Sequence, residues 1–356
     1  MSDYLKLTTY FGERQRLGPR FVADAVLDLL ADRKVVNSVL LRGVTGFGGR
    51  HVLRTDASLS LSEDPPVTIA ALDSAEVMNG VADGVAALLP RGVMTLERTR
   101  LIGGAATEFT APDHDTVRLT IPMGRNRHID GVPTFAAVCD LLSKHGFISA
   151  TAFLGVDGTA GGQRRRARFF SRNLDVPLMV VAVGTGTQTR AALPGLRDTL
   201  GDTLMTAERA QVCKRDGTLL GRPPALPDAD ANGRPLWQKL MVHTSEDTLH
   251  KGVPIHRALV RQLLQSRTAR GATVLRGVWG FADNKRLLGD RLIQWGRQVP
   301  VTTVVVDSPD NIARSFDVID AVTAQHGLVT CETVPALLAL DGAGRRGSLG
   351  LAEPRY

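Results

Sequence analysis

The sequence predicts an α+β protein made of three tandem units of about a hundred residues, each with the order strand, helix, strand, strand, helix, strand. Three observations predict this fold class. The chain has 356 residues, and domains of roughly 100 to 200 residues would divide it into two or three. Apolar residues make up 43% of the chain and charged residues 22%, the balance of a folded globular protein. Four landmarks also recur three times in the same order, as in an internal repeat.

The first part of each unit combines a short strand with a helix. Alternating residues predict strands at 5–8, 117–120 and 238–241. A glycine and a proline follow, and they predict the start of an amphipathic helix because proline is favoured at the first helical position. This landmark stands at Gly18-Pro19, Gly131-Val132-Pro133 and Gly252-Val253-Pro254.

Two apolar strands and a second helix come next. The second strand ends in a turn with glycine at residues 38–48 and 272–281, and in a degenerate form at 150–158. The third strand begins at a proline, namely Pro66, Pro177 or Pro300. In two copies it leads into a helix N-cap, Asp73-Ser74 and Asp307-Ser308.

The last strand carries the motif Thr-x-Glu, at residues 95–97, 206–208 and 330–332. Alternation of inward and outward side chains explains this motif better than a catalytic glutamate does. The landmarks of the first and second copies are 111 to 113 residues apart, and those of the second and third 121 to 124. This order of elements is the split βαβ arrangement of ferredoxin-like domains. Since helices would cover one face of each sheet, the other face needs a partner.

The units are predicted at residues 1–104, 116–213 and 236–340, with the middle one divergent. Residues 105–115 are short and polar, and residues 214–235 are rich in proline, glycine and aspartate, so both are predicted linkers. Residues 341–356 are predicted to form a disordered basic tail, which we prefer to a phosphorylation site at Arg345–Ser348.

Composition excludes several classes of protein. No apolar run approaches the roughly 18 residues of a membrane helix, and the first residues do not open a signal peptide, so we expect a cytoplasmic protein. Cys139, Cys213 and Cys331 are odd in number and far apart, which predicts small core residues. The net charge of +7 attracts anions such as nucleotides and nucleic acid. Aromatic residues are only 5% of the chain, however, which leaves few stacking partners for single strands.

Signatures of catalysis and of cofactors are missing from the sequence. Eight histidines are scattered without a His-x-x-x-His pair, and the cysteines form no metal-binding pattern. Gly184–Gly186 is too short for a dinucleotide fingerprint, and no Gly-x-Ser-x-Gly or carboxylate pair stands out. We therefore expect that the protein is not an enzyme and that it holds no cofactor and no metal.

The stretch Val39–Gly48, continued through residues 59–66 to Asp73-Ser74, resembles the bacterial family catalogued as domain of unknown function 190, the UPF0166 type, which is similar in fold to PII signalling proteins. Residues 272–281 and 299–308 repeat this signature, whereas the middle copy lacks its Arg-Gly pair and its Gly-Phe turn. The resemblance implies three tandem ferredoxin-like, PII-like domains in an intramolecular pseudo-trimer, with sheets facing a common centre and small effectors in clefts between units.

Two loops of each copy are candidates for effector binding. The turn after the second strand either brings backbone amides close to a phosphate or merely uses glycine for a tight connection. The loop after the second helix faces the nucleotide in PII proteins, but their lysine-bearing phosphate loop is absent here, which argues against ATP. A basic loop in the middle copy suits phosphate groups, nucleic acid or an acidic partner, or is simply solvated. The effector candidates are Gly46, Phe47, Gly48, Gly49, Arg50, His51, Arg91, Gly92, Gly280, Phe281, Asn284, Lys285, Arg286, His326 and Gly327, and the basic loop holds Arg164, Arg165, Arg166 and Arg168.

The resemblance implies a regulatory or signalling protein that binds a small anionic effector, with a nucleotide as one candidate, in its inter-repeat clefts and modulates a partner protein. A membrane transporter such as a fluoride exporter is a candidate partner by the same resemblance. The alternatives are a basic nucleic-acid-binding protein, which the scarce aromatic residues oppose, and an enzyme with an unrecognised site. We expect a monomeric chain whose clefts are unequal, because the middle copy has lost the loop signature.

Overall fold

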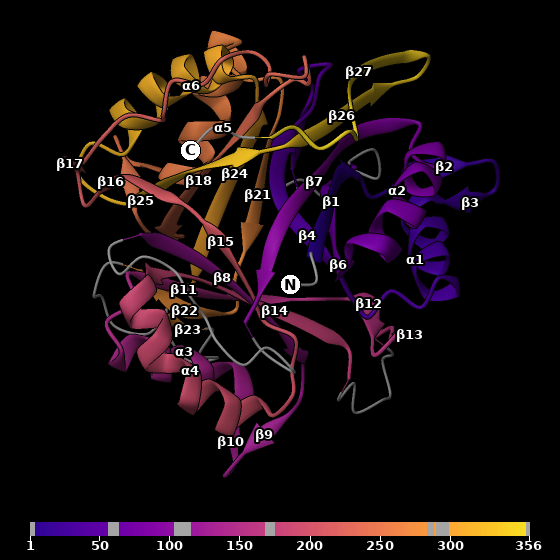
Figure 1. Cartoon of the computed structure of the whole chain (residues 1–356). Coiled ribbons are helices and arrows are strands. Elements are labelled where there is room, and N and C mark those ends of the chain that lie inside the picture. Colours follow the sequence, from indigo (N-terminus) through magenta and orange to yellow (C-terminus); the bar gives the residue numbers. More distant parts are fainter. Residues whose placement is uncertain are drawn as a thin grey trace.

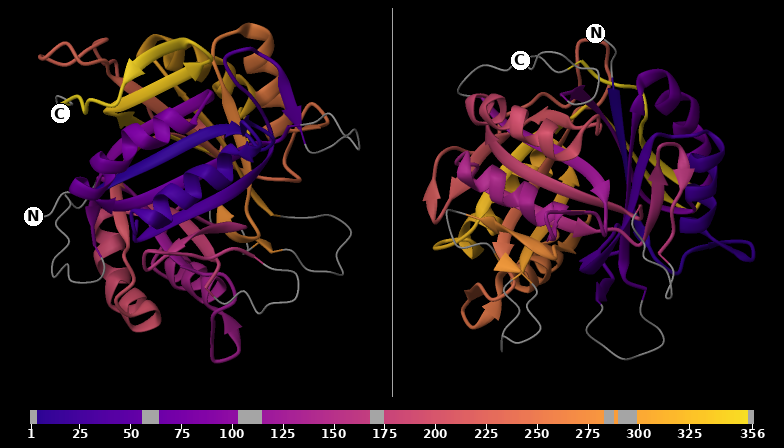
Figure 2. Two further views of the ribbon diagram at one scale, coloured as in Figure 1. Left: turned by 90° about the vertical axis from the view of Figure 1, so that its right-hand side faces the viewer. Right: turned by 90° about the horizontal axis from the view of Figure 1, so that it is seen from below.

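Three units surround a common centre in the computed structural model, which describes residues 4–55, 64–102, 115–167, 175–282, 288–289 and 299–353. In Figure 1 the first unit is indigo to purple, the second magenta to rose, and the third orange to yellow. Six helices of the described residues lie on the outside, while the strands of all three units meet in the middle (Figures 1 and 2). The chain is therefore a mixed α+β protein.

All three units have the same element order and the same sheet. In each, four antiparallel strands lie in the spatial order second, third, first, fourth, and two helices cover one face. The first unit consists of β1 (Tyr4–Gly12), α1 (Val22–Asp32), β4 (Asn37–Phe47), β6 (Pro66–Ser74), α2 (Ala75–Leu88) and β7 (Arg91–Leu101). The second consists of β8 (Thr116–Gly124), α3 (Thr134–Lys144), β11 (Ser149–Leu154), β14 (Pro177–Thr185), α4 (Gly186–Leu200) and β15 (Thr206–Arg209). The third consists of β18 (Trp237–Ser245), α5 (Ile255–Ser266), β21 (Ala272–Arg276), β24 (Pro300–Asp307), α6 (Pro309–Val322) and β25 (Leu328–Val334).

Shorter strands are attached to the three four-stranded sheets. A small hairpin precedes the first helix of each unit, and further short strands extend the main ones. The hairpins are β2 (Arg16–Leu17) with β3 (Arg20–Phe21), β9 (His128–Ile129) with β10 (Val132–Pro133), and β19 (Leu249–His250) with β20 (Val253–Pro254). The extensions are β5 (Leu53–Thr55), β12 (Asp157–Ala160), β13 (Gln163–Arg164), β16 (Gln211–Arg215), β17 (Thr218–Leu219), β22 (Trp279–Ala282), β23 (Leu288–Gly289), β26 (Ala336–Asp341) and β27 (Gly344–Ser348).

The glycine and proline landmark lies just before each first helix and not inside it. Pro133 and Pro254 are the N-cap residues of α3 and α5, and Gly18-Pro19 lies in the turn between β2 and β3. The predicted placement of proline at the first helical position is therefore wrong by one residue or more. The turn of the small hairpin uses the positive φ of these glycines, which is 60° at Gly18 and 79° at Gly131 and Gly252.

The Asp-Ser pair at the end of the third strand joins two elements. Ser74 caps α2 by accepting a hydrogen bond from the Val77 amide at 3.4 Å, whereas Ser308 makes no such cap to α6. The aspartate that precedes the serine instead accepts a hydrogen bond from a backbone amide one or two residues before the second strand. Asp73 binds the Val36 amide at 2.7 Å, and Asp307 binds the Arg270 amide at 2.9 Å. The motif therefore fixes the second strand against the third.

The units exchange strands in a closed cycle. At the carboxyl end of each unit, the chain adds a strand to the next one: the end of β7 pairs with β15, β16 pairs with β25, and β26 pairs with β7. After the second strand, the chain reaches in the opposite direction: the end of β4 pairs with β21, β12 pairs with β4, and β22 pairs with β11. These exchanges join all the sheets into one continuous sheet of 21 described strands.

The segments after the second and third units contain strands, although the sequence predicts a linker and a disordered tail there. Part of the predicted linker 214–235 belongs to β16 and to β17, which pairs with it. The predicted disordered tail is wrong for residues up to 348, since β26 and β27 form a hairpin on the first unit. We call residues 336–348 the C-terminal hairpin. It is ordered because β7 offers an unpaired edge, which a strand readily completes.

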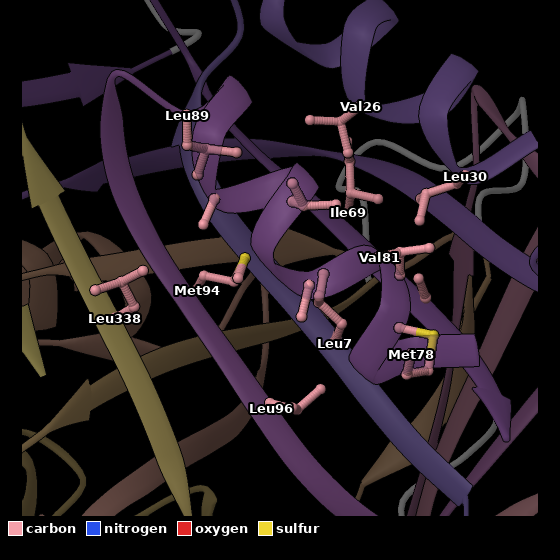
Figure 3. Close-up of a cluster of buried hydrophobic side chains, with 14 of the residues drawn as sticks. Leu7, Val26, Leu30, Ile69, Met78, Val81, Leu89, Met94, Leu96 and Leu338 are labelled. Carbon is pink, nitrogen blue, oxygen red and sulfur yellow. The ribbon is translucent and has the colours of Figure 1, made fainter. Parts of the chain in front are cut away.

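Each unit has its own hydrophobic core beneath its helices, and neighbours contribute to it. In the first unit Leu7, Ile69, Met78 and Met94 pack together, and Leu338 of the C-terminal hairpin lies beside Met94 (Figure 3). Phe47 of the first unit belongs to the third core, and Phe281 of the third unit belongs to the second.

Two further expectations concern the cysteines and membranes. Cys139, Cys213 and Cys331 are free and buried, which confirms the prediction of small core residues. Among the described residues no helix is both long enough and apolar enough to cross a membrane.

Candidate functional site

Six charged side chains meet where the three sheets face each other. Each first strand contributes a cation and each last strand contributes the glutamate of its Thr-x-Glu motif, and each side chain is 7% exposed or less. Within every unit the cation lies directly opposite the glutamate in the strand register. We call these residues the central ion network: Lys6, Glu97, Arg118, Glu208, Lys239 and Glu332.

The hydrogen bonds of this network run from unit to unit. Lys6 donates to Oε1 of Glu208 at 2.8 Å, and Lys239 donates to Oε2 of Glu97 at 2.5 Å. Arg118 donates to both carboxylate oxygens of Glu332, at 2.5 and 2.9 Å. Three cations and three carboxylates therefore close a cycle through all three units.

The charges of the network set each other's protonation. Burial alone would raise the pKa of Glu332, but Arg118 and Lys239 lower it from 4.5 to about 2. Burial alone would lower the pKa of Lys239, but Glu332 and Glu97 hold it above its ordinary value. Burial, followed by the nearby Arg118 guanidinium, lowers the pKa of Lys6. Glu332 is therefore charged near neutral pH, and the network links the three units through buried ion pairs.

A cavity of about 570 Å³ lies between the first and third units. The first unit contributes the end of β1, residues 47–52, Arg54 and the start of β7. The third contributes Trp237, residues 270–271, Thr273, the end of β24 and the C-terminal hairpin. The cavity is therefore bounded by both strand exchanges of this junction, and we call it the inter-unit cavity.

Several of the predicted effector-binding residues come together on this cavity. The turn after β4 and the start of β7 are far apart in the sequence, yet both face it. Gly46 is not a lining residue, because it lies in the strand pair with β21, where a Cβ atom would be 2.4 Å from the Ala272 carbonyl oxygen. The predicted residues that line the cavity are Phe47, Gly48, Gly49, Arg50, His51, Arg91 and Gly92.

Arginines give the cavity a positive character. Arg50 donates from Nε to Asp341 at 3.1 Å, and Nε of Arg91 lies 3.4 Å from the same carboxylate. The Arg346 guanidinium lies over the Trp237 ring at 4.7 Å and 3.6 Å from Asp307. Six arginines and two aspartates line the cavity in all: Arg50, Arg54, Arg91, Arg270, Arg345, Arg346, Asp307 and Asp341.

Apolar and unsatisfied polar groups complete the lining. The His51 ring stacks on Phe47 with centroids 5.8 Å apart. The Nδ1 atom of His51 and the Oε1 atom of Gln15 are buried without a hydrogen-bond partner. Burial raises the pKa of Tyr10, another lining residue, to about 12. Buried polar atoms without partners are uncommon, so these two atoms distinguish the wall of the cavity from an ordinary packed core.

The predicted residues of the third copy have other positions. Gly280 approaches the second unit so closely that a Cβ atom would be 2.0 Å from the Ala150 carbonyl oxygen, and Phe281 is 1% exposed in the second core. This turn therefore packs units together. Gly327 accepts a hydrogen bond from the Asp216 amide at 3.1 Å and lies, with His326, beside the second-to-third connection. Asn284, Lys285, Arg286 and Arg168 lie outside the described residues.

The basic loop of the middle copy is largely paired within the chain. Arg164 forms ion pairs with Asp24, Asp28 and Asp157, and Arg166 lies 3.1 Å from Asp24. Arg165 donates to Gln163 at 2.8 Å. Because Asp24 and Asp28 belong to α1, these pairs hold the loop against the first unit and leave less charge for a phosphate or a nucleic acid.

Sequence reasoning missed the third-unit side of the cavity and the central ion network. Trp237, Arg270 and Arg346 reach the cavity through strand exchange, which no local pattern indicates. The network did leave a signal, because a lysine or arginine recurs at residues 6, 118 and 239 with the same spacing as the landmarks. Among the described residues, no three His, Cys, Asp or Glu side chains are grouped to hold a metal ion.

Comparison with known proteins gives one family. The model of the DUF190 family, described as "Uncharacterized ACR, COG1993", matches residues 4–101, 116–212 and 237–336. The UPF0166 protein of Aquifex aeolicus (strain VF5) is 30% identical over 98 residues, which are 28% of this chain and 90% of that relative. Each match to the family model coincides with one structural unit, and a stretch as long as one unit accounts for nearly all of the relative.

Proposed function

Since the chain belongs to the DUF190 family in three tandem copies, we propose that it is a PII-like regulatory protein that binds a small anionic effector between its units and thereby modulates a partner protein. The proposal has three parts: a PII-like fold in each unit, an intramolecular pseudo-trimer, and an effector site in the inter-unit cavity. It describes a binding protein and not an enzyme.

The topology supports the first two parts. Each unit has the element order of the split βαβ arrangement, with its sheet ordered second, third, first, fourth. The sheet face without helices carries the central ion network, so it is buried by the other two units. A lone unit of this kind would expose that charged face, which explains why three are needed.

The inter-unit cavity is the observation that carries the effector site. Its volume of about 570 Å³ falls within the roughly 300–1,000 Å³ typical of small-molecule sites. It combines guanidinium groups, which bind carboxylate and phosphate through paired hydrogen bonds, with aliphatic and aromatic side chains. A planar apolar group that carries negative charge fits this lining, so a nucleotide is our first candidate.

Residues of the inter-unit cavity also suggest how ligand binding changes a surface that a partner protein contacts. Arg50 and His51 lead directly into Val52 and Leu53, whose exposed fractions are 61% and 51%. A ligand that held Arg50 would favour one arrangement of this segment over another, and only such differential binding shifts a conformational equilibrium. A membrane transporter, such as a fluoride exporter, remains our candidate partner.

Isothermal titration calorimetry with adenine, guanine and cyclic nucleotides tests the proposal on the full chain. We expect one class of nucleotide to bind, and Arg91→Ala to weaken it about tenfold or more, since a charge-assisted hydrogen bond contributes about 1.5–3 kcal/mol. Arg127→Ala is the matched control, because this exposed arginine of the second unit pairs with Asp175 away from the cavity. Absence of binding by every nucleotide would refute the nucleotide version.

A further inference from the structure

The C-terminal hairpin distinguishes one junction from the other two. The third match to the family model ends at residue 336, where the hairpin begins. Its first strand pairs with β7 from Ala336 opposite Leu96 to Asp341 opposite Arg91. The hairpin thus lies outside the segment that defines the family, and it forms one wall of the inter-unit cavity.

We propose that the C-terminal hairpin makes the inter-unit cavity the single anion-selective site of the chain, with Arg345 and Arg346 as its specificity-determining residues and Asp341 as an internal competitor of the ligand. The ligand class is an aromatic anion, bound once per chain. This inference rests on the proposed effector site and adds its stoichiometry and its selectivity.

The two arginines are held differently. Arg346 is positioned by the Trp237 ring and by Asp307, at 4.7 and 3.6 Å. Arg345 lines the same cavity and has no ion-pair partner among the described residues. One arginine is therefore fixed in place, and the other offers an uncompensated charge, which suits a ligand that brings its own negative group.

Asp341 occupies the position of an anion. Arg50 and Arg91, from two separate segments of the first unit, converge on its carboxylate at 3.1 and 3.4 Å. All three side chains are about half exposed, so the pairs are weak and easily replaced. An incoming anion would compete with Asp341 for Arg50, and the Arg50 segment would respond to the ligand.

Several cations described at the other two junctions already have carboxylate partners. At the first-to-second junction Arg164 is held by Asp24, Asp28 and Asp157. At the second-to-third junction Lys214 pairs with Asp320, and Arg222 pairs with Asp317 at 2.5 Å. Unlike these cations, Arg345 has no ion-pair partner among the described residues, and it lines the inter-unit cavity.

Fluorescence titration of the full chain with 8-anilinonaphthalene-1-sulfonate, an aromatic anion, tests the inference. We expect one bound probe per chain, at least about tenfold weaker binding for the Arg345→Ala/Arg346→Ala variant, and tighter binding for Asp341→Asn. Tightening is the diagnostic result, because a purely structural role of Asp341 would not produce it. Arg222→Ala and Asp317→Asn are matched controls, because this exposed ion pair lies at the second-to-third junction and outside the lining of the inter-unit cavity, and they should leave binding unchanged.

Circular dichroism of each variant checks the fold, and Arg345→Ala alone serves if the double variant does not fold, since Arg345 is exposed. Three probes per chain, no probe bound, unchanged affinity without Arg345, or weaker binding by Asp341→Asn would each overturn the inference. Nucleotides that fail to bind while the probe shows the expected pattern would refute the nucleotide proposal and leave this one standing.

Discussion

Replacement of Arg118 by methionine should destabilise the whole chain, because it unbalances the central ion network. The guanidinium is 5% exposed, donates to Glu332 at 2.5 and 2.9 Å and lies 3.5 Å from Glu208. Without it, two ammonium groups face three buried carboxylates. Loss of one partner of a buried ion pair costs about 3–5 kcal/mol, because the remaining charge stays desolvated. We expect Arg118→Met to lose this much.

The double variant Arg118→Met/Glu332→Met separates the charge effect from simple loss of packing. It removes one charge of each sign and leaves Lys6 and Lys239 with Glu97 and Glu208. Replacing a buried pair with apolar side chains of similar size is often neutral or stabilising. The two substitutions should therefore be coupled by about 3 kcal/mol, with the double variant more stable than either single one.

Urea unfolding at pH 7, followed by far-ultraviolet circular dichroism, measures these differences, provided that the slope of free energy against urea stays constant. Arg127→Met is the control, since this ion pair with Asp175 is exposed and contributes about 1 kcal/mol or less. A double variant as unstable as the sum of the two single variants, or an Arg118→Met loss below about 1 kcal/mol, would show that the network does not hold the units together.

Three other predictions test the exchange of strands and the buried histidines. Phe47→Ala should lower the free energy of unfolding by about 3–5 kcal/mol, because this ring is 4% exposed in the core of the third unit. Phe21→Ala is the control, since its ring is 37% exposed and should contribute far less. Urea unfolding measures both losses, and equal losses would contradict the packing described. Gly280→Ala should lower the melting temperature, since φ is 148° and a Cβ atom would lie 2.0 Å from the Ala150 carbonyl oxygen. Gly80→Ala, in the open on helix α2, should be neutral or raise it, and the reverse order would refute the close approach. Burial lowers the pKa of both His243 and His256 from 6.5 to about 4, so the unfolded chain binds protons more readily than the folded one. Stability should be complete above pH 6.5 and fall as the pH decreases to about 4, by up to about 3 kcal/mol for each histidine. His243→Gln should flatten the pH dependence of urea unfolding, and an unchanged slope would count against burial as the cause.

Local patterns in the sequence were enough to predict the units and their elements. The second strand, predicted at residues 38–48, is β4 at 37–47, and the third strand begins at Pro66, Pro177 and Pro300 as predicted. These features depend on neighbouring residues, namely alternation, turn glycines and caps. The first helices begin later than predicted, because the glycine and proline form a hairpin turn of their own.

Pairings between units could not be predicted, because the sequence of an edge strand does not indicate which strand will pair with it. Residues 341–348 resemble a polar tail in composition, yet residues 344–348 form β27, which pairs with β26 on the edge of β7. Phe47 follows a glycine and resembles a loop residue, but it is part of a neighbour's core. The predicted cavity residues of the first unit were recognisable from their glycines and arginines, whereas those of the third unit depended on this pairing.

The Thr-x-Glu motif shows the limit of reasoning about one strand at a time. Alternation was the correct reason for its spacing, since Glu97 and Thr95 face the same way along β7 and hydrogen bond at 3.0 Å. The glutamate nevertheless joins two units, because Lys6 lies opposite it in the first unit and Lys239 of the third unit donates a hydrogen bond to it. The sequence pattern within one strand does not indicate which charged side chain of another unit will contact it.

The covalent union of the three units has a consequence for how this protein can change. In an assembly of identical subunits every substitution appears at all symmetric positions at once. Here the ring of cations is lysine, arginine and lysine at residues 6, 118 and 239. The equivalent residues after the second strand, which enter a neighbouring core or sheet, are Phe47, Thr159 and Phe281. One chain with three copies can thus keep two junctions as scaffolding while a single junction takes on a new role.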